Sequence, residues 1–146
     1  MPEVTFEVEG LPPRKDGGSP MWEKQFNELS ALRERAFEEM KKLPPNTLFV
    51  KNICLVIEVF MDAKNIQTPR SGDLDNFIGG ICDGLMKAGR DARLHKDWYA
   101  LSKEPIHPTH SIAIKDDAAV ISINASKKGR ESGGKDHYCV KISGDV

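Results

Sequence analysis

The chain has 146 residues, a length that suits one domain large enough to bury a core without disulfide or metal staples. Its formal net charge at pH 7 is -1 and 29% of its residues are charged, which is typical of a soluble globular protein. The near-neutral net charge neither supports nor excludes a polyanion partner, because such binding depends on local patches of basic residues. No run approaches the roughly 20 apolar residues of a membrane span, so we expect no contact with a membrane.

The three cysteines, Cys54, Cys82 and Cys139, are odd in number, lie far apart and form no CxxC pair. This usage is typical of reduced thiols in a cytoplasmic protein. The acidic, alternating start of the chain does not have the pattern of a signal peptide.

The first half of the chain predicts a strand, a loop, a helix and a second strand. Apolar and polar residues alternate over 4–8, and a glycine-containing loop follows at 10–18. Ser19, followed by a proline, predicts the start of a helix. The pair of prolines at 44–45 predicts its end. The segment 48–61 is apolar on both faces, so we expect it at the centre of the sheet.

The second half predicts a second helix and two further strands. After a polar loop at 62–72, helical spacing of apolar residues covers about 76–88. Residues 90–113 show no clean period and indicate a long loop or insertion with one helical turn. Alternating residues at 119–123 and 138–142 predict two strands that form a hairpin.

The order β-α-β-α-β-β predicts one α/β domain over residues 1–146, of the two-layer α+β type. Two main helices would cover a small mixed four-stranded sheet.

Two groups of acids flank the second predicted helix. Asp73 and Asp75 are two residues apart, a spacing that points both side chains the same way in an extended chain. Asp116 and Asp117 directly precede the third strand, and the loop that enters this strand can lie beside the start of the helix. Three or four carboxylates would then converge, and such an all-oxygen cluster suits Mg²⁺ or Mn²⁺. A metal ion of this kind can polarise a phosphodiester and activate a water molecule.

Each of these features also has a plainer interpretation. One acid of the first pair can be a helix cap, and the second pair can be an ordinary turn before a strand. Asp83, on the helix face of Asn76 but two turns further along, can be an exposed helical acid. Gly79 and Gly80 can simply let the helix approach a neighbour closely. Three histidines are alternative zinc ligands, but the chain has no cysteine pair or HExxH motif beside them: His95, His107 and His110.

Taken in order, these motifs resemble the RusA-type Holliday junction resolvase family. That family shows D-L-D-N at the start of a helix, an aspartate before a small residue and leucine within the helix, and a D-D pair before a strand. The corresponding residues here are Asp73, Leu74, Asp75 and Asn76, then Asp83, Gly84 and Leu85, then Asp116, Asp117 and Val120. The early strand that ends in L-P-P at 11–13 also resembles the start of the family.

The resemblance implies a homodimeric, Mg²⁺-dependent endonuclease that cuts branched DNA such as four-way junctions. It implies that Asp73, Asp75 and Asp117 are catalytic acids that bind the metal, with Asp116 as a further ligand. An isologous dimer would offer two equal sites to a junction of near two-fold symmetry. Supporting roles would fall to Asn76, Asp83, Lys87 and Lys115.

The chain departs from the family pattern at one lysine. The family usually has a catalytic lysine four residues after the second motif aspartate, and Gly79 stands at that position. Lysine would balance charge on the scissile phosphate. Lys87, on the same helix face, and Lys115, before the acid pair, are the candidates to replace it.

The segment 90–113 is a second departure, because it is longer than the link the family usually has. Its Trp98 and Tyr99 either stack on nucleic acid or form a small satellite core. Other contacts to DNA phosphates would come from basic residues in predicted loops. These residues are Arg14, Lys15, Arg70, Lys127, Lys128 and Arg130.

The leading hypothesis is therefore a metal-dependent, structure-selective endodeoxyribonuclease. The alternative is a DNA-junction-binding protein of the same fold without catalytic activity, and Gly79 motivates it. A third hypothesis is a structural or interaction domain whose acids are caps and solvated charges.

Overall fold

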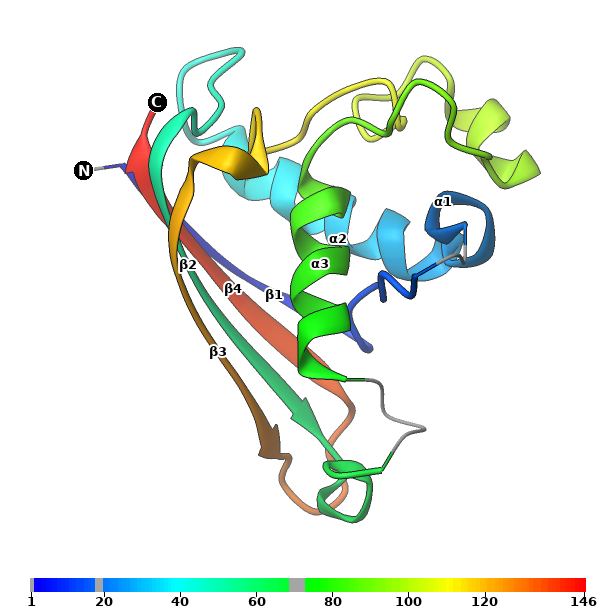
Figure 1. The fold of residues 1–146 in the computed structure, drawn as a ribbon, viewed down its shortest axis with the longest axis vertical. Helices are drawn as coiled ribbons and strands as arrows, with labels where there is room; N and C mark the ends of the chain where they lie inside the picture. The colour runs from blue at the N-terminus through cyan, green and yellow to red at the C-terminus, as the bar shows by residue number, and fades with distance from the viewer. Residues whose placement is uncertain (1, 18–19, 69–72) are drawn as a thin grey trace.

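A computed structural model describes residues 2–17, 20–68 and 73–146. A four-stranded sheet forms one layer, and the helices pack on one of its faces (Figure 1). The predicted α/β class and its two-layer arrangement are confirmed. The strands are β1 (Glu3–Glu9), β2 (Lys51–Met61), β3 (Val120–Gly129) and β4 (His137–Asp145).

The helical segments cover one face of the sheet. The first predicted helix consists of two helices, because the chain breaks at Gln25, whose side chain bonds the backbone of Arg14. The second predicted helix begins at Leu74 rather than Asn76. The α-helices are α1 (Met21–Lys24), α2 (Phe26–Met40) and α3 (Leu74–Leu85), and the short 3₁₀ helices are η1 (Ala63–Asn65), η3 (Lys96–Leu101) and η4 (Asp117–Ala119).

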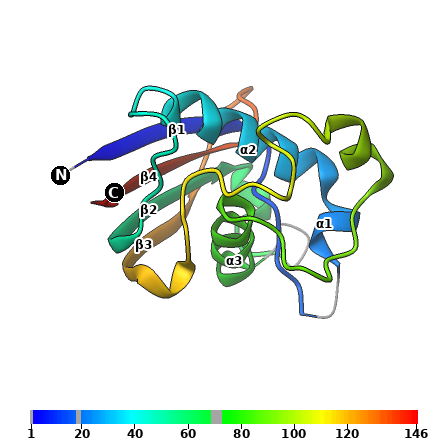
Figure 2. The same cartoon turned by 90° about the horizontal axis from the view of Figure 1, so that it is seen from above.

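The strand order in the sheet is β1-β4-β2-β3 (Figure 2). β4 is antiparallel to both β1 and β2, whereas β2 and β3 are parallel. The predicted hairpin between the last two strands is wrong, because β2 lies between them. A parallel pair requires a crossover connection, and the chain between β2 and β3 provides one through α3.

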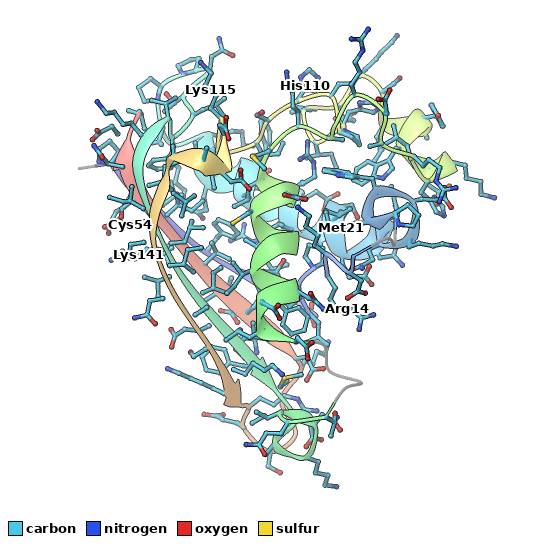
Figure 3. All side chains as sticks on the ribbon, in the orientation of Figure 1. Arg14, Met21, Cys54, His110, Lys115 and Lys141 are labelled. Carbon is cyan, nitrogen blue, oxygen red and sulfur yellow. The ribbon has the colours of Figure 1, made fainter. Side chains whose placement is uncertain are left out.

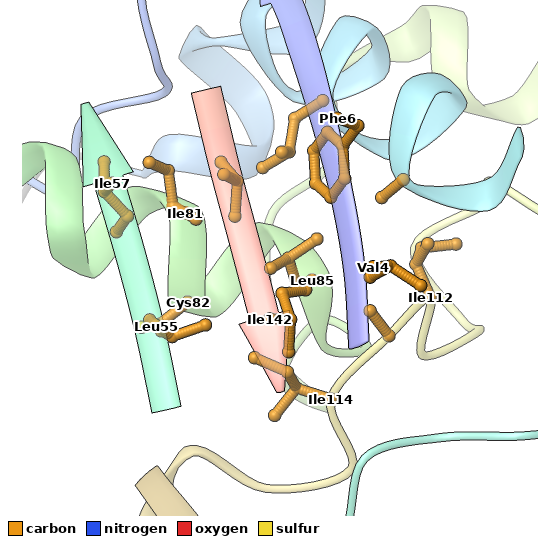
Figure 4. Close-up of a cluster of buried hydrophobic side chains, with 14 of the residues drawn as sticks. Val4, Phe6, Leu55, Ile57, Ile81, Cys82, Leu85, Ile112, Ile114 and Ile142 are labelled. Carbon is orange, nitrogen blue, oxygen red and sulfur yellow. The ribbon is translucent and has the colours of Figure 1, made fainter. Parts of the chain in front are cut away.

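The core lies between the sheet and the two main helices (Figure 4). Leu55 and Ile57 of β2 project from the sheet toward Ile81 and Leu85 of α3, and all four are at most 1% exposed. β2 is a central strand, as its apolar composition predicts, because it pairs with both β4 and β3.

A buried arginine joins α2 to the segments that follow α3. Arg33 is 0% exposed, and its guanidinium donates five hydrogen bonds to backbone carbonyls. The acceptors are the carbonyls of Gly84, Met86, Ile106, His107 and His110, at 2.5–2.9 Å. Burial lowers the pKa of Arg33 to about 9, which still leaves it protonated at neutral pH. The carbonyls therefore replace the water that the cation lost.

The long segment after α3 has a small core of its own. Trp98 of η3 is 0% exposed and its ring lies 5.9 Å from that of Trp22. The indole N–H of Trp98 donates to the carbonyl of Trp22 at 3.0 Å. The satellite-core interpretation is thus confirmed for Trp98, whereas Tyr99 is 66% exposed.

Within the described ranges, no helix has the length and apolar character needed to cross a membrane. The three cysteines are free.

We predict that Arg33→Met lowers the free energy of unfolding by about 3–5 kcal/mol, because the change removes the buried cation that donates to five backbone carbonyls. Arg35→Met is the matched control on the same helix, since the Arg35 side chain is 43% exposed. Its effect should stay below about 1 kcal/mol. Urea denaturation measures both, and equal losses in the two variants would contradict this account.

We predict that Tyr138→Phe raises the free energy of unfolding by about 1 kcal/mol. The Tyr138 hydroxyl is buried and has no hydrogen-bond partner among the described residues. Burial also raises the pKa of Tyr138 well above its ordinary value, so the hydroxyl stays neutral. Tyr99→Phe, at a 66% exposed position, should change the midpoint of thermal unfolding very little. A destabilised Tyr138→Phe protein would reveal a partner for the hydroxyl.

Candidate active site

The first pair of acids lies at the N-terminal end of α3. Asp73 occupies the N-cap position, yet its side chain makes no capping hydrogen bond. Asp75 is already in the first helical turn. Side chains two residues apart point the same way in an extended chain but not in a helix. The expectation that Asp73 and Asp75 point the same way is therefore wrong.

The second pair of acids lies at the opposite end of the same helix. The backbone N–H of Asp117 contacts the Met86 sulfur at 3.2 Å, and Met86 directly follows α3. A helix of 12 residues is roughly 18 Å long. The structure therefore keeps Asp73 and Asp75 apart from Asp117, as Figure 1 shows for η4 and the start of α3.

The parallel pairing of β2 and β3 explains this separation. α3 returns the chain from the end of β2 to the beginning of β3, so residues before the helix and residues before the strand lie at opposite ends of these parallel strands. The convergence expected from the sequence is wrong for a single chain. Asp116 accepts a hydrogen bond from Ala118 N–H at 2.9 Å, which fits the interpretation as a turn before a strand.

Asp83 and Asp117 nevertheless line one hollow of about 430 Å³ between α3 and β3. Lys15 reaches into the same hollow, and its ammonium lies 3.0 Å from the Asp83 carboxylate. The hydrogen bond and the charge of Asp83 raise the pKa of Lys15, and Asp117 adds to the effect. Burial first, and then the charges of Asp117 and Asp83, raise the pKa of Cys82 to about 11.

The loop before α1 carries Lys15 across α3 (Arg14 is labelled in Figure 3). The backbone N–H of Lys15 donates to the carbonyl of Asn76 at 3.0 Å, and the Asn76 amide donates to Asp16 at 2.9 Å. A Cβ at Gly80 would lie 1.9 Å from the carbonyl oxygen of Pro13, so only glycine permits this approach. Asn76 thus holds the loop that positions Lys15.

Gly79 leaves room for the side chain of Lys15. A Cβ at Gly79 would lie 3.2 Å from the Cβ of Lys15, closer than most such contacts. The cation in the hollow is therefore Lys15, and neither predicted replacement lines it. Lys87 is exposed beyond the end of α3, and Lys115 lines a different hollow (Lys115 is labelled in Figure 3).

A metal ion held by three acids does not fit the residues of a single chain. Among the residues that the structure describes, no group of three or more His, Cys, Asp or Glu side chains is placed to hold one. A divalent cation at Asp117 would need further ligands from water, from DNA or from another copy of the chain.

The predicted DNA-binding residues fall in several places. Lys127 and Lys128 belong to β3 rather than to a loop, because the strand continues to Gly129. Lys127 donates to the carbonyl of Ile66, and Lys128 pairs with Glu58. Arg70 lies outside the described residues.

The remaining predicted basic residues have acidic or backbone partners. Arg130 pairs with Asp136 at 2.8 Å and Asp62 at 3.6 Å. The backbone of Arg14 is fixed by Gln25, through hydrogen bonds of 2.5 and 2.6 Å. The hydrogen bonds of Arg14 involve only its backbone, whereas Arg130 would have to exchange its carboxylate partners for a phosphate.

No protein-family model and no curated protein matches the sequence. The resemblance to the resolvase family therefore rests on the order and spacing of its motifs.

Two features of the site were missed at the level of sequence. The pairing of Lys15 with Asp83 joins segments far apart in the chain, and the pair of glycines at 79–80 was its one local signal. Arg33 gave no signal, because it stands among other charged residues of a helix.

We predict that Gly80→Ala lowers the free energy of unfolding by about 1–3 kcal/mol, because the added methyl group collides with backbone at Pro13. Gly89→Ala is the matched control, since a Cβ there meets open space. It should be neutral or stabilise by up to about 1 kcal/mol. Thermal unfolding distinguishes the two variants, and equal behaviour would contradict the close approach of the loop to α3.

Proposed function

We propose that the chain is a metal-dependent, structure-selective endodeoxyribonuclease that hydrolyses phosphodiester bonds in branched DNA, such as four-way junctions. The observation that carries this proposal is the hollow between α3 and β3. It brings together Asp83 and Asp117, which come from two separate parts of the motif, and adds Lys15 as a cation.

Asp73, Asp75 and Asp117 are the proposed catalytic and metal-binding acids, with Asp116 beside them and Mg²⁺ or Mn²⁺ as the cofactor. Such an ion supplies Lewis acidity and an activated water when bound. Because one chain separates these acids, the proposal requires ligands from more than one molecule.

Lys15 is proposed to bind the phosphate. Its ammonium is paired with Asp83, and its side chain is 56% exposed, so an incoming phosphate can share it. A lysine near the reacting phosphate balances the charge that develops there. Asp83 is then a positioning residue, because it acts through Lys15.

The proposed contacts to DNA extend along β3 from the hollow at its start. Lys127 and Lys128 stand near the other end of β3, and Arg14 lies in the loop between β1 and α1. Because these contacts are to phosphates, binding should weaken as salt rises.

We predict that Asp75→Asn and Asp117→Asn each reduce Mg²⁺-dependent cleavage of a four-way junction on the order of 100-fold or more. Each variant removes one of the proposed metal-binding charges. The control is Asp91→Asn, an exposed acid in the segment after α3 that should cut at the wild-type rate. A labelled junction and a gel assay measure the rates, and equal cutting by wild type and Asp75→Asn would remove that acid from the site.

The same assay distinguishes the alternative of a junction-binding protein without catalytic activity. Gly79 favours this alternative, because it replaces the lysine that the resemblance leads one to expect. Tight junction binding with no product at any Mg²⁺ or Mn²⁺ concentration would support the alternative of a binding protein without activity. Gain of cleavage by the Gly79→Lys variant would support that alternative further. Absence of both DNA affinity at low salt and divalent-cation binding would instead support a structural domain.

A further inference from the structure

A second hollow, of about 640 Å³, lies between the end of α2, the loop at 43–48 and the segment 103–112. That loop and that segment lie at the same end of the molecule in Figure 1, and His110 of the segment is labelled in Figure 3. The second hollow shares no lining residue with the hollow between α3 and β3. Ligand sites typically have volumes of roughly 300–1,000 Å³ and mostly apolar walls. The size of the second hollow therefore suits a small organic ligand.

Hydrogen bonds and prolines fix both sides of the second hollow, so its shape is formed before a ligand arrives. The N–H of Phe49, just after the loop, donates to the carbonyl of Ala113 at 2.8 Å, which ties the loop to the segment. The guanidinium of Arg33 donates to the carbonyl of His110 at 2.5 Å and holds the segment against α2. Proline restricts the backbone by fixing φ. Three prolines line the hollow: Pro44, Pro45 and Pro105.

The lining of the second hollow combines apolar side chains with cations. None of the described residues that line it is Asp or Glu, whereas Lys41 and Lys103 both do. The ammonium of Lys41 lies 5.4 Å from the centre of the Phe37 ring and pairs with Glu38 at 3.1 Å. Lys103 is exposed and has no ion-pair partner among the described residues. The apolar side chains come from α2, the loop and the segment: Phe37, Met40, Leu43, Leu48 and Ile112.

We propose that the second hollow binds a small organic carboxylate with an aromatic or branched aliphatic body. The body lies against the apolar side chains, whose contact with it removes apolar surface from water. The carboxylate accepts hydrogen bonds from the ammonium groups of Lys41 and Lys103, and such charge-assisted bonds are stronger than neutral ones. An organic cation would meet like charges at this site, and a neutral molecule would leave the lysines without an anion.

The lining favours a small molecule over a peptide or a nucleic acid. No strand contributes to the second hollow, so an extended peptide finds no backbone edge to pair with. Only one turn of α2, from Phe37 to Lys41, lines it, which is too short for a groove along a helix. Nucleic acid binds to rows of cations that follow its phosphates. Two lysines beside an apolar surface do not form such a row.

A titration of the full chain, followed by two-dimensional ¹H–¹⁵N NMR, tests the site with three probes. 2-Naphthoate, which joins a carboxylate to an aromatic body, should shift the amide signals of Lys41, Leu43, Lys103 and Ser111, which line the hollow. Naphthalene-2-methanol, with the same body and no charge, should bind about 5- to 10-fold more weakly. Acetate, which lacks the body, should leave these signals in place.

Two adjacent lysines provide matched variants. Lys41 and Lys42 are 52% and 71% exposed and pair with Glu38 and Glu39, but only Lys41 lines the second hollow. Lys41→Gln should weaken 2-naphthoate binding about 3- to 10-fold and leave naphthalene-2-methanol binding unchanged. Lys103→Gln should behave in the same way. Lys42→Gln should bind both probes with wild-type affinity.

Several outcomes would overturn the proposal. These are no shift of the lining signals up to the solubility limit of 2-naphthoate, equal affinity for the carboxylate and the alcohol, or equal weakening by Lys41→Gln and Lys42→Gln. Tighter binding of an acidic peptide that contains one phenylalanine and is blocked at both ends would assign the hollow to a peptide instead. Shifts of the same signals with protein concentration alone would assign it to a second copy of the chain.

This proposal is independent of the proposed function. The titration measures binding at residues that do not line the hollow of Asp83 and Asp117. Failure of 2-naphthoate to bind would leave the nuclease proposal standing. Failure of the chain to cut junctions would leave the carboxylate site standing.

Discussion

The buried guanidinium of Arg33 is the interaction on which the arrangement of the site depends. Its hydrogen bonds collect the last carbonyls of α3, at Gly84 and Met86, together with carbonyls from the segment 106–110. Carbonyls at a helix C-terminus carry partial negative charge and attract a cation. One side chain of α2 therefore fixes both the end of α3 and the long connection after it. That connection leads directly into η4, and so into the position of Asp117 beside the hollow.

A second constraint is the crossover itself. Because β2 and β3 are parallel, any helix between them must carry the chain back along the sheet. Acids placed before the helix and acids placed before the strand are then kept apart by the full length of α3. Close packing at Gly80 brings the loop of Lys15 over the same helix and leaves its ammonium beside Asp83. The fold thus holds one group of acids at each end of α3.

Apolar periodicity was sufficient to predict the strands β2 and β4. β2 is apolar on both faces and is central, and the alternation at 138–142 marks a strand that is buried on one face. The order of the strands could not be predicted, because the same alternation in β4 fits a hairpin with β3 or a position between β1 and β2. The sequence indicated which residues belong to the site but not how they are arranged. The position of Asp117 depends on Arg33 and on the segment 90–113, whose sequence shows no period.

The resemblance leads one to expect a lysine at position 79, but the cation beside this surface of α3 comes from Lys15. A lysine at position 79 would start from the surface of α3 that borders the hollow, and the side chain of Lys15 lies against that same surface. Glycine at 79 and the ion pair of Lys15 with Asp83 are therefore parts of one arrangement, since a larger residue at 79 would crowd Lys15. A comparison of the motif positions alone indicates that the cation is missing at position 79. The three-dimensional arrangement instead contains a cation supplied by a different segment, held to α3 by Asn76 and within reach of both Asp83 and the open hollow.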